Sequence, residues 1–314
     1  MKFNLLITGG LGYIGSFTAK NYLKKTRKKL FVVDNLSRGN FFAKKYSNNS
    51  ILDISNNKLN KIIEKKKINT IIHLASFTCV RESIRKKSKY LNNYKSQVKF
   101  INNVKKTSVK YFIFSSSLSV YEKNKYKRNL SPYSMYKLKI EKYLKTISSK
   151  NFKVIILRYP NIIGSDPSGK LGEKNDFISR IVPLFYKNLL KTKKNTLFYD
   201  YDKKIYPSRN YMHVDDISNI NLKVVENLDK FKNRYQIFNI KNKKEYSNFE
   251  VLNSLSKIMK KKPIIDLKQI NNKESIQQII NTKNDILKII KYNIKYKDLK
   301  KILQTNLRWF KKIY

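Results

Sequence analysis

The 314-residue chain has little cysteine and histidine: one cysteine, Cys79, and two histidines, His73 and His213. One cysteine excludes an internal disulfide and a cysteine-rich metal site, and two histidines argue against a histidine-rich metal centre. No stretch approaches the roughly 18 consecutive apolar residues of a membrane span. The apolar run at the N-terminus meets glycines too early for a secretory signal. We therefore expect a soluble, cytoplasmic protein with no metal and no membrane association.

Acidic residues are also scarce, with 21 Asp and Glu against 69 Lys and Arg, a formal net charge of +48. Such an excess is typical of proteins that bind nucleic acid or an anionic surface. Here, however, most of the basic residues are lysine, whereas arginine is the usual reader of base edges. Lysine, asparagine and isoleucine all have AT-rich codons, so drift in composition accounts for the charge as well. We expect no nucleic-acid partner, and little nucleic-acid retention in filter binding at about 150 mM salt.

Hydrophobic residues make up 41% of the chain, which is enough for a substantial core. Short apolar runs occur at residues 3–8, 30–34, 70–75, 111–115 and 154–159. Segments with helical spacing lie between them, at residues 13–25, 56–65, 90–106 and 133–148. Apolar strands that alternate with helices predict an α/β fold with a doubly wound, Rossmann-type parallel sheet.

The pattern changes near residue 165, where proline, glycine and aspartate interrupt the alternation. We interpret residues 1–165 as a Rossmann domain and residues 166–314 as mainly a smaller, mixed α/β lobe for the substrate. A segment near residues 210–235 is expected to return to the first domain.

Three glycines, Gly9, Gly12 and Gly15, follow the first expected strand and open the first expected helix. This spacing permits a tight turn, lets main-chain amides approach a pyrophosphate, and allows close packing of helix on strand. The second strand ends in Asp34, whose carboxylate can accept hydrogen bonds from ribose hydroxyls and would repel a 2′-phosphate. The sequence therefore predicts NAD rather than NADP, although Arg38 lies close enough to leave NADP open.

Tyr133 and Lys137 stand four residues apart on an expected helix and therefore share one face. An ammonium beside a phenol favours the phenolate, which would make Tyr133 a usable general base near neutral pH. Both residue types are abundant here, so the pair alone is a weak signal. The position of the pair strengthens the signal, because the preceding strand ends in Ser117, at the edge where open α/β sheets bind ligands. A serine there would hydrogen-bond a substrate hydroxyl and relay its proton.

Several stretches, in this order, resemble the extended short-chain dehydrogenase/reductase family, that is, the NAD-dependent epimerases and dehydratases. They are ITGGLGYIGS, VVDNLSRGN, IIHLAS, FIFSSSLSVY, SPYSMYK, LRYPNIIG, DPSGKLGE and RNYMHVDDIS. The likeness spans residues 1 to about 220 and is greatest to the nucleotide-sugar 4-epimerases.

The resemblance implies roles for individual residues. Those expected to bind NAD are Gly9, Gly12, Tyr13, Ile14, Gly15, Asp34, Asn35, Asp53, Ile54, Leu74, Ala75, Ser76, Asn93, Lys137 and Tyr159. Ser117, Tyr133 and Lys137 would be catalytic. The substrate would contact Ser117 and Tyr133, and its diphosphate would lie at Asn161, Arg209 and Arg180. Both histidines are expected to serve packing.

The implied reaction is epimerisation at C4 of a nucleotide sugar, with a UDP-sugar expected. Tyr133 would take the proton of the 4-hydroxyl while C4 gives hydride to NAD+. The resulting 4-keto sugar would turn over and take the hydride back on its other face. Such a cycle regenerates the cofactor, so NAD should stay bound. The resemblance also implies a homodimer through the helices that follow Tyr90 and Tyr133.

The chain departs from the 4-epimerase pattern at several positions. Arg180 stands where the pattern has an asparagine before a Leu-x-Pro stretch, and as a cation it would bind phosphate directly. The loop between Tyr121 and Ser131 is short. The family's later diphosphate-binding arginine has no clear counterpart at residues 268–273, and the residue that governs sugar size falls near Gln278. The substituents at C2 and C6 of the sugar therefore stay open.

Other chemistries within the family are alternatives. Dehydratases carry an Asp-Glu pair directly after the catalytic serine or threonine, where this chain has Leu118 and Ser119. Decarboxylases carry a glutamate at the position of Ser119. These residues argue against both alternatives, because neither Leu118 nor Ser119 is acidic. A nucleotide-sugar reductase, or a non-catalytic Rossmann-fold binding protein, stays open as well.

Overall fold

The structure, a computed structural model, describes residues 3–26, 30–39, 48–121, 130–173, 180–201, 204–269 and 285–314. Its centre is a seven-stranded sheet in the order β10-β6-β5-β4-β1-β2-β3, with every neighbouring pair parallel. The strands are β1 (Leu5–Thr8), β2 (Phe31–Asp34), β3 (Asn48–Ile51), β4 (Thr70–His73), β5 (Tyr111–Ser117), β6 (Lys153–Tyr159) and β10 (Tyr235–Asn239). The predicted Rossmann-type parallel sheet is confirmed.

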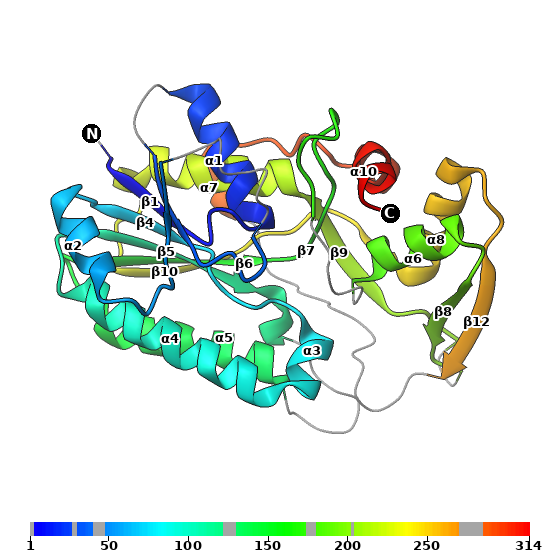
Figure 1. Ribbon diagram of the computed structural model, residues 1–314, viewed down its shortest axis with the longest axis horizontal. Helices are drawn as coiled ribbons and strands as arrows, with labels where there is room; N and C mark the ends of the chain where they lie inside the picture. Colours follow the sequence, from blue (N-terminus) through cyan, green and yellow to red (C-terminus); the bar gives the residue numbers. More distant parts are fainter. Residues whose placement is uncertain are drawn as a thin grey trace.

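Helices cover both faces of this sheet (Figure 1). One face carries α1 (Tyr13–Lys25) and α7 (Val214–Glu226), and the other carries α2 (Lys58–Lys65), α4 (Lys87–Lys105) and α5 (Pro132–Ile147). Side chains alternate between the two faces along each strand. On β1, Leu5 and Ile7 belong to the core under α1 and α7, whereas Leu6 belongs to the core under α4 and α5. Burial on both faces explains why the central strands are continuous apolar runs.

The two edge strands, β3 and β10, were not among the strands expected from the sequence. The β3 sequence, Asn48–Ile51, is mostly polar, and Ile237 in the middle of β10 is partly exposed. An edge strand pairs on one side only and lies at the border of the core, so it does not need an apolar run. The place of β10 beside β6, with α7 packed on α1, puts residues 214–239 against the large sheet.

The rest of the chain builds two smaller sheets. One contains β11 (Glu245–Ser247), β9 (Ser208–His213) and β7 (Asn161–Ile163), and the other pairs β12 (Ile264–Gln269) with β8 (Lys194–Tyr199). Helices α6 (Ile181–Leu190), α8 (Asn248–Met259) and α10 (Leu299–Ile313) form a third core around the buried Trp309 and Phe310. Two short helices, α3 (Val80–Arg85) and α9 (Asp285–Ile289), complete the described elements other than 3₁₀ turns.

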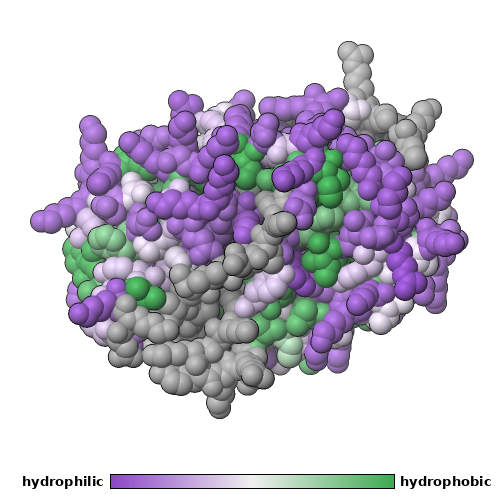
Figure 2. Space-filling model, turned by 180° about the vertical axis from the view of Figure 1, so that it is seen from behind, coloured by the Kyte–Doolittle hydropathy of each residue, from purple (hydrophilic) through white to green (hydrophobic). Residues whose placement is uncertain are grey.

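The surface is rich in hydrophilic side chains. On the face that Figure 2 shows, they surround smaller hydrophobic patches over several elements. Within the described ranges, no helix combines the length and the apolar character that a membrane crossing requires.

Candidate cofactor and active site

The turn between β1 and α1 requires glycine at two positions. Gly9 has φ +68°, and a Cβ there would lie 2.6 Å from the main-chain N of Ala75. A Cβ on Gly15 would lie 2.2 Å from Gly9 O, because the helix crosses directly over the turn. Gly12 is the N-cap of α1. A Cβ there would lie 3.1 Å from Gly9 O, which is a less severe clash than at Gly15. Tyr13 and Ile14 form the first turn of α1, so its main-chain amides face the carboxyl edge of the sheet, as an anion site needs.

Two carboxylates lie beside this turn. Asp34, only 7% exposed at the end of β2, accepts hydrogen bonds from the main-chain N of Leu11 (3.0 Å) and of Leu36 (2.8 Å). Burial raises the pKa of Asp34, and these main-chain hydrogen bonds oppose the rise. Asp53 accepts from Asn35 Nδ2 (2.8 Å). The predicted NAD-binding residues Asp34, Asn35 and Asp53, with the buried Ile54, are thus held together at one edge of the sheet.

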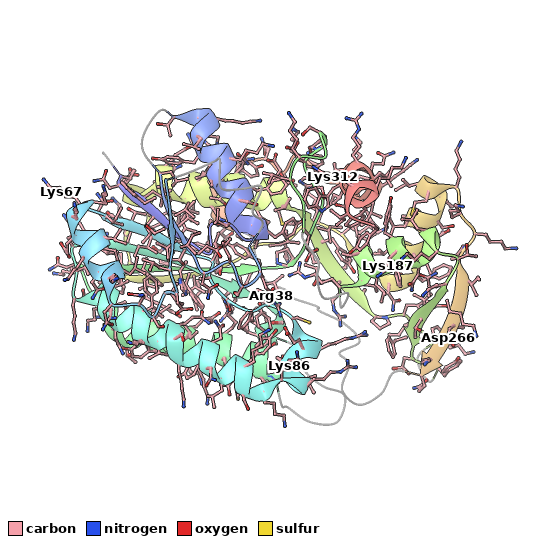
Figure 3. The ribbon with its side chains drawn as sticks, in the orientation of Figure 1. Arg38, Lys67, Lys86, Lys187, Asp266 and Lys312 are labelled. Carbon is pink, nitrogen blue, oxygen red and sulfur yellow. The ribbon has the colours of Figure 1, made fainter. Side chains whose placement is uncertain are left out.

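Arg38 is held by an acidic partner. Its guanidinium forms an ion pair with Glu82 on α3 and lies 4.9 Å from the ring centre of Phe77. Arg38 is labelled near the middle of Figure 3. Lys89 also pairs with Glu82, at 2.9 Å. Although partial burial raises the pKa of Glu82, the bonds from Arg38 and Lys89 lower it to about 2. Arg38 therefore has an acidic partner within the protein, which it shares with Lys89.

Helix α5 carries Tyr133 and Lys137. It begins with Ser131 as N-cap, whose Oγ accepts from Ser134 N (3.2 Å), and with Pro132 in its first turn. Tyr133 and Lys137 are both buried on the face toward the sheet. Lys137 Nζ donates to Ser115 O at 2.8 Å, and burial lowers the pKa of Lys137 to about 7, with Glu141 opposing.

A small cavity of about 10 Å³ brings the predicted NAD-binding residues Ser76 and Asn93 together with the catalytic pair, Tyr133 and Lys137. Its lining residues are Ser76, Phe77, Tyr90, Asn93, Tyr94, Gln97, Tyr133, Tyr136, Lys137 and Ile140. Leu74 and Ala75 lie next to it in the chain, directly after β4, and Leu74 N donates to Thr8 O. The structure therefore brings several predicted NAD-binding residues together with the predicted catalytic pair.

Gln97 is a residue of this site that the motifs did not reveal. Its Nε2 donates to Asn93 Oδ1 at 2.9 Å, and Phe77 N donates to the same oxygen at 3.3 Å. These bonds fix the Asn93 amide with its Oδ1 occupied. The signal in the sequence was the i, i+4 spacing of Asn93 and Gln97 on one helix.

Ser117 is the last residue of β5, beside Tyr159 of β6 in the register. Its Oγ accepts from Ser119 N at 3.1 Å. Ser119 lies in the 3₁₀ turn η2 (Leu118–Tyr121), and its buried Oγ accepts from Ser134 Oγ at 2.9 Å. This hydrogen bond links the 3₁₀ turn after β5 to the start of α5, the helix that carries Tyr133.

The Tyr159 side chain lies in the core rather than in the site. Its hydroxyl donates to Asn221 Oδ1 on α7 at 2.6 Å, and burial raises its pKa. Any contact of Tyr159 with a cofactor would therefore be made by its main-chain atoms.

Arg180, directly before α6, lies among groups from three other segments. Its Nε pairs with Glu173 Oε1 at 3.0 Å, its Nη2 donates to Thr78 Oγ1 at 3.2 Å, and its Nη1 donates to Ile162 O at 3.5 Å. Burial lowers the pKa of Arg180, but Glu173 and the phenols of Tyr13 and Tyr133 raise it overall. The predicted substrate residue Arg180 is thus close enough to the predicted base, Tyr133, to interact with it electrostatically.

The other expected diphosphate residues lie on the three-stranded sheet. Asn161 is exposed at the start of β7, and its partner in the register is Tyr211 on β9. Arg209, two residues before Tyr211, donates from Nη1 to Ser208 O at 2.7 Å and lies near Glu245. Most of the 121–131 loop (residues 122–129), the 270–273 segment and Gln278 lie outside the described residues.

Both histidines are packed. His73 stacks on Phe100 with ring centres 5.1 Å apart, and His213 stacks on Tyr296 at 3.9 Å. His213 Nδ1 also accepts from Asp215 N, which caps α7. Burial lowers the pKa of His73 to about 3 and that of His213 to about 4, so both are neutral at physiological pH.

Residues 5–240 match the sequence profile of the NAD dependent epimerase/dehydratase family, about three quarters of the chain. The chain therefore belongs to this family, and the resemblance inferred from the motifs is confirmed.

Among its relatives are proteins named UDP-glucose 4-epimerase. That of Yersinia enterocolitica is 30% identical over 84% of this chain and 85% of its own length. That of Lacticaseibacillus casei is 27% identical over 97% and 96%. The solved structure of the UDP-Glc/GlcNAc 4-epimerase of Campylobacter jejuni is similar with a TM-score of 0.80 and 27% identity, covering 99% of this chain and all of that one.

Proposed function

We propose that the protein is an NAD-dependent nucleotide-sugar 4-epimerase that interconverts UDP-glucose and UDP-galactose or closely related UDP-sugars. The observation that carries this proposal is the joining of Ser76, Asn93, Tyr133 and Lys137 around one small cavity in a member of this family. Relatives that cover most of the chain carry the same activity in their names.

The described residues fit NAD. Gly9 and Gly15 keep the β1–α1 turn close enough for α1 to offer its N-terminal amides to a pyrophosphate. The buried Asp34 disfavours a 2′-phosphate, and Arg38, the cation that could have accepted one, is paired with Glu82. These contacts favour NAD over NADP.

When bound, NAD would supply the acceptor, and later the donor, of the hydride of C4 of the sugar. The protein transfers one proton and holds the sugar ring. Tyr133 takes the proton of the 4-hydroxyl to give a 4-keto sugar, and returns it after the sugar has turned over. Lys137, when protonated, supplies a buried positive charge near the phenol, and Ser117 hydrogen-bonds the reacting oxygen. Asn161, Arg180 and Arg209 bind the diphosphate while the sugar turns.

The 3₁₀ turn after β5 favours epimerisation over elimination. Ser119, at the position where related dehydratases and decarboxylases carry an acid, is buried and bonded to Ser134. The side chain of Leu118 is buried as well. A 4-keto sugar formed beside these residues would meet no acid from this turn to drive loss of water or CO₂.

We further propose a division of labour between residues 1–165, with α7 and β10, as the cofactor domain and the rest as the substrate lobe. A homodimer through α4 and α5 is part of the proposal. These helices form an outer layer of the molecule (Figure 1). Tyr94 of α4 stacks on Tyr136 of α5 at 5.0 Å, and both rings are half-buried, which suits a surface that a second copy covers.

The direct test is incubation of the purified protein with UDP-glucose, UDP-galactose and their N-acetyl forms, without added NAD. We expect interconversion of at least one pair, since the cofactor is retained. Failure to interconvert any of the four, in protein shown to contain NAD, would refute the proposed activity.

A further inference from the structure

The guanidinium of Arg180 is held firmly on one edge and loosely on the other. The Nε edge faces Glu173 at 3.0 Å, whereas the Nη1 contact with Ile162 O, at 3.5 Å, is at the limit of a hydrogen bond. The Nη2 contact with Thr78 is an uncharged bond of 3.2 Å. An arginine fixed through Nε presents its two Nη groups in one plane, which suits two oxygens of a phosphate.

Glu173 is fixed from behind by the C-terminal helix. Trp309 Nε1 donates to Glu173 O at 2.8 Å, and Trp309 is almost fully buried. A Cβ on the neighbouring Gly172 would lie 2.4 Å from the indole ring, so the ring packs directly on the main chain here. The Glu173 side chain is 14% exposed and that of Arg180 is 34% exposed, so the carboxylate lies inside and the guanidinium faces outward.

The charges around Glu173 support a fixed ion pair. Burial raises the pKa of Glu173, and Arg180 and Arg38 oppose that rise. Tyr13, which also interacts with Glu173 electrostatically, is half-buried and donates its hydroxyl to Gly164 O. Removal of Arg180 would leave the buried carboxylate of Glu173 poorly balanced.

We propose that Glu173 is a positioning residue for phosphate recognition, which holds Arg180 with its Nη edge toward the diphosphate of the substrate. Trp309 in turn holds Glu173, so helix α10, which lies beyond the residues that match the family profile, supports the recognition of the nucleotide. The inference rests on the proposed function for the identity of the anion, a nucleoside diphosphate.

The test is calorimetric titration of the NAD-containing protein with UDP. We expect Glu173→Gln to weaken binding about tenfold, the loss of one oriented charge-assisted contact, and Arg180→Ala to weaken it at least as much. In the Arg180→Ala background, Glu173→Gln should have no further effect on Kd. The matched control is Asp166→Asn, in the same connection between β7 and α6. It removes the ion pair of Asp166 with Lys20 and should leave the Kd for UDP unchanged.

Two results would overturn the inference. Tighter UDP binding by Glu173→Gln would mean that the carboxylate competes with phosphate for Arg180. Equal losses in both backgrounds, with a lower Tm, would mean that Glu173 only supports the fold. Because UDP binding needs no turnover, a protein that shows the coupling but epimerises nothing would refute the proposed activity alone, whereas an active protein without the coupling would refute only the role of Glu173.

Discussion

The large parallel sheet and the C-terminal lobe hold their functional groups in different ways. In the sheet region, Lys137 is buried and bonded to a strand carbonyl, and Asp34 is bonded to two main-chain amides. In the lobe, Arg180 is one-third exposed and its Nη1 contact with Ile162 O is long, at 3.5 Å. The difference indicates that the groups assigned to chemistry are fixed before the substrate arrives, whereas the cation assigned to recognition is fixed through Nε and can still exchange partners at its Nη edge.

The largest expected effect lies in the sheet region, at Tyr133. Tyr133→Phe should lower turnover about 10²- to 10⁴-fold, because the phenol is the proposed proton acceptor. NAD content and Tm should stay close to wild type. Tyr143→Phe, ten residues along the same helix and outside the lining of the cavity, is the matched control. Near-normal turnover of Tyr133→Phe, measured by chromatography of the UDP-sugars, would remove Tyr133 as the base.

The glycine turn allows folding to be separated from cofactor binding. Gly15→Ala would place a Cβ 2.2 Å from Gly9 O, so we expect a loss of about 1–3 kcal/mol in the free energy of unfolding together with loss of NAD. Gly12→Ala meets the same oxygen at 3.1 Å. It should cost less stability while still weakening NAD binding. Denaturant unfolding and the NAD content of the purified variants measure both quantities, and equal destabilisation by the two variants would contradict this reading of the turn.

Lys137 predicts a pH dependence of stability. Its folded pKa is about 7 against an ordinary value of 10.5, so between these values the unfolded chain binds more protons than the folded one. The contribution of Lys137 to the free energy of unfolding therefore rises with pH across this window and is lowest below pH 7. In Lys137→Met this rise should vanish. Unfolding of NAD-free protein at several pH values tests it, and parallel wild-type and variant profiles would contradict it.

The smallest expected effect lies at the far end of the C-terminal lobe. Leu267 on β12 is 44% exposed, so Leu267→Ala should cost at most about 1 kcal/mol of unfolding free energy. Leu6→Ala, at a fully buried position of β1, should cost about 2–5 kcal/mol. Equal costs in chemical denaturation would show that β12 is as tightly packed as the central sheet.

The central strands and the glycine turn could be predicted because their causes are local. Leu5, Leu6 and Ile7 must all be apolar when helices cover both faces, and Gly9 must be glycine when φ is positive. The polar strand β3 carries no such requirement, since its pairing with β2 depends on main-chain atoms.

The parts of the site that could not be predicted from the sequence depend on contacts between segments that lie far apart in the chain. The bond from Trp309 to Glu173 spans 136 residues, and that from Arg180 to Thr78 spans 102. Neither pair has a spacing that a sequence motif could express. The core position of Tyr159 likewise depends on Asn221, which is 62 residues away.

The indole of Trp309 has a practical consequence. It is the sole tryptophan among 314 residues, and it lies on the main chain of Glu173. Selective excitation of tryptophan therefore gives this protein a built-in optical probe next to the proposed phosphate site. Ligand binding there can be followed by emission in solution, with no label and no added dye.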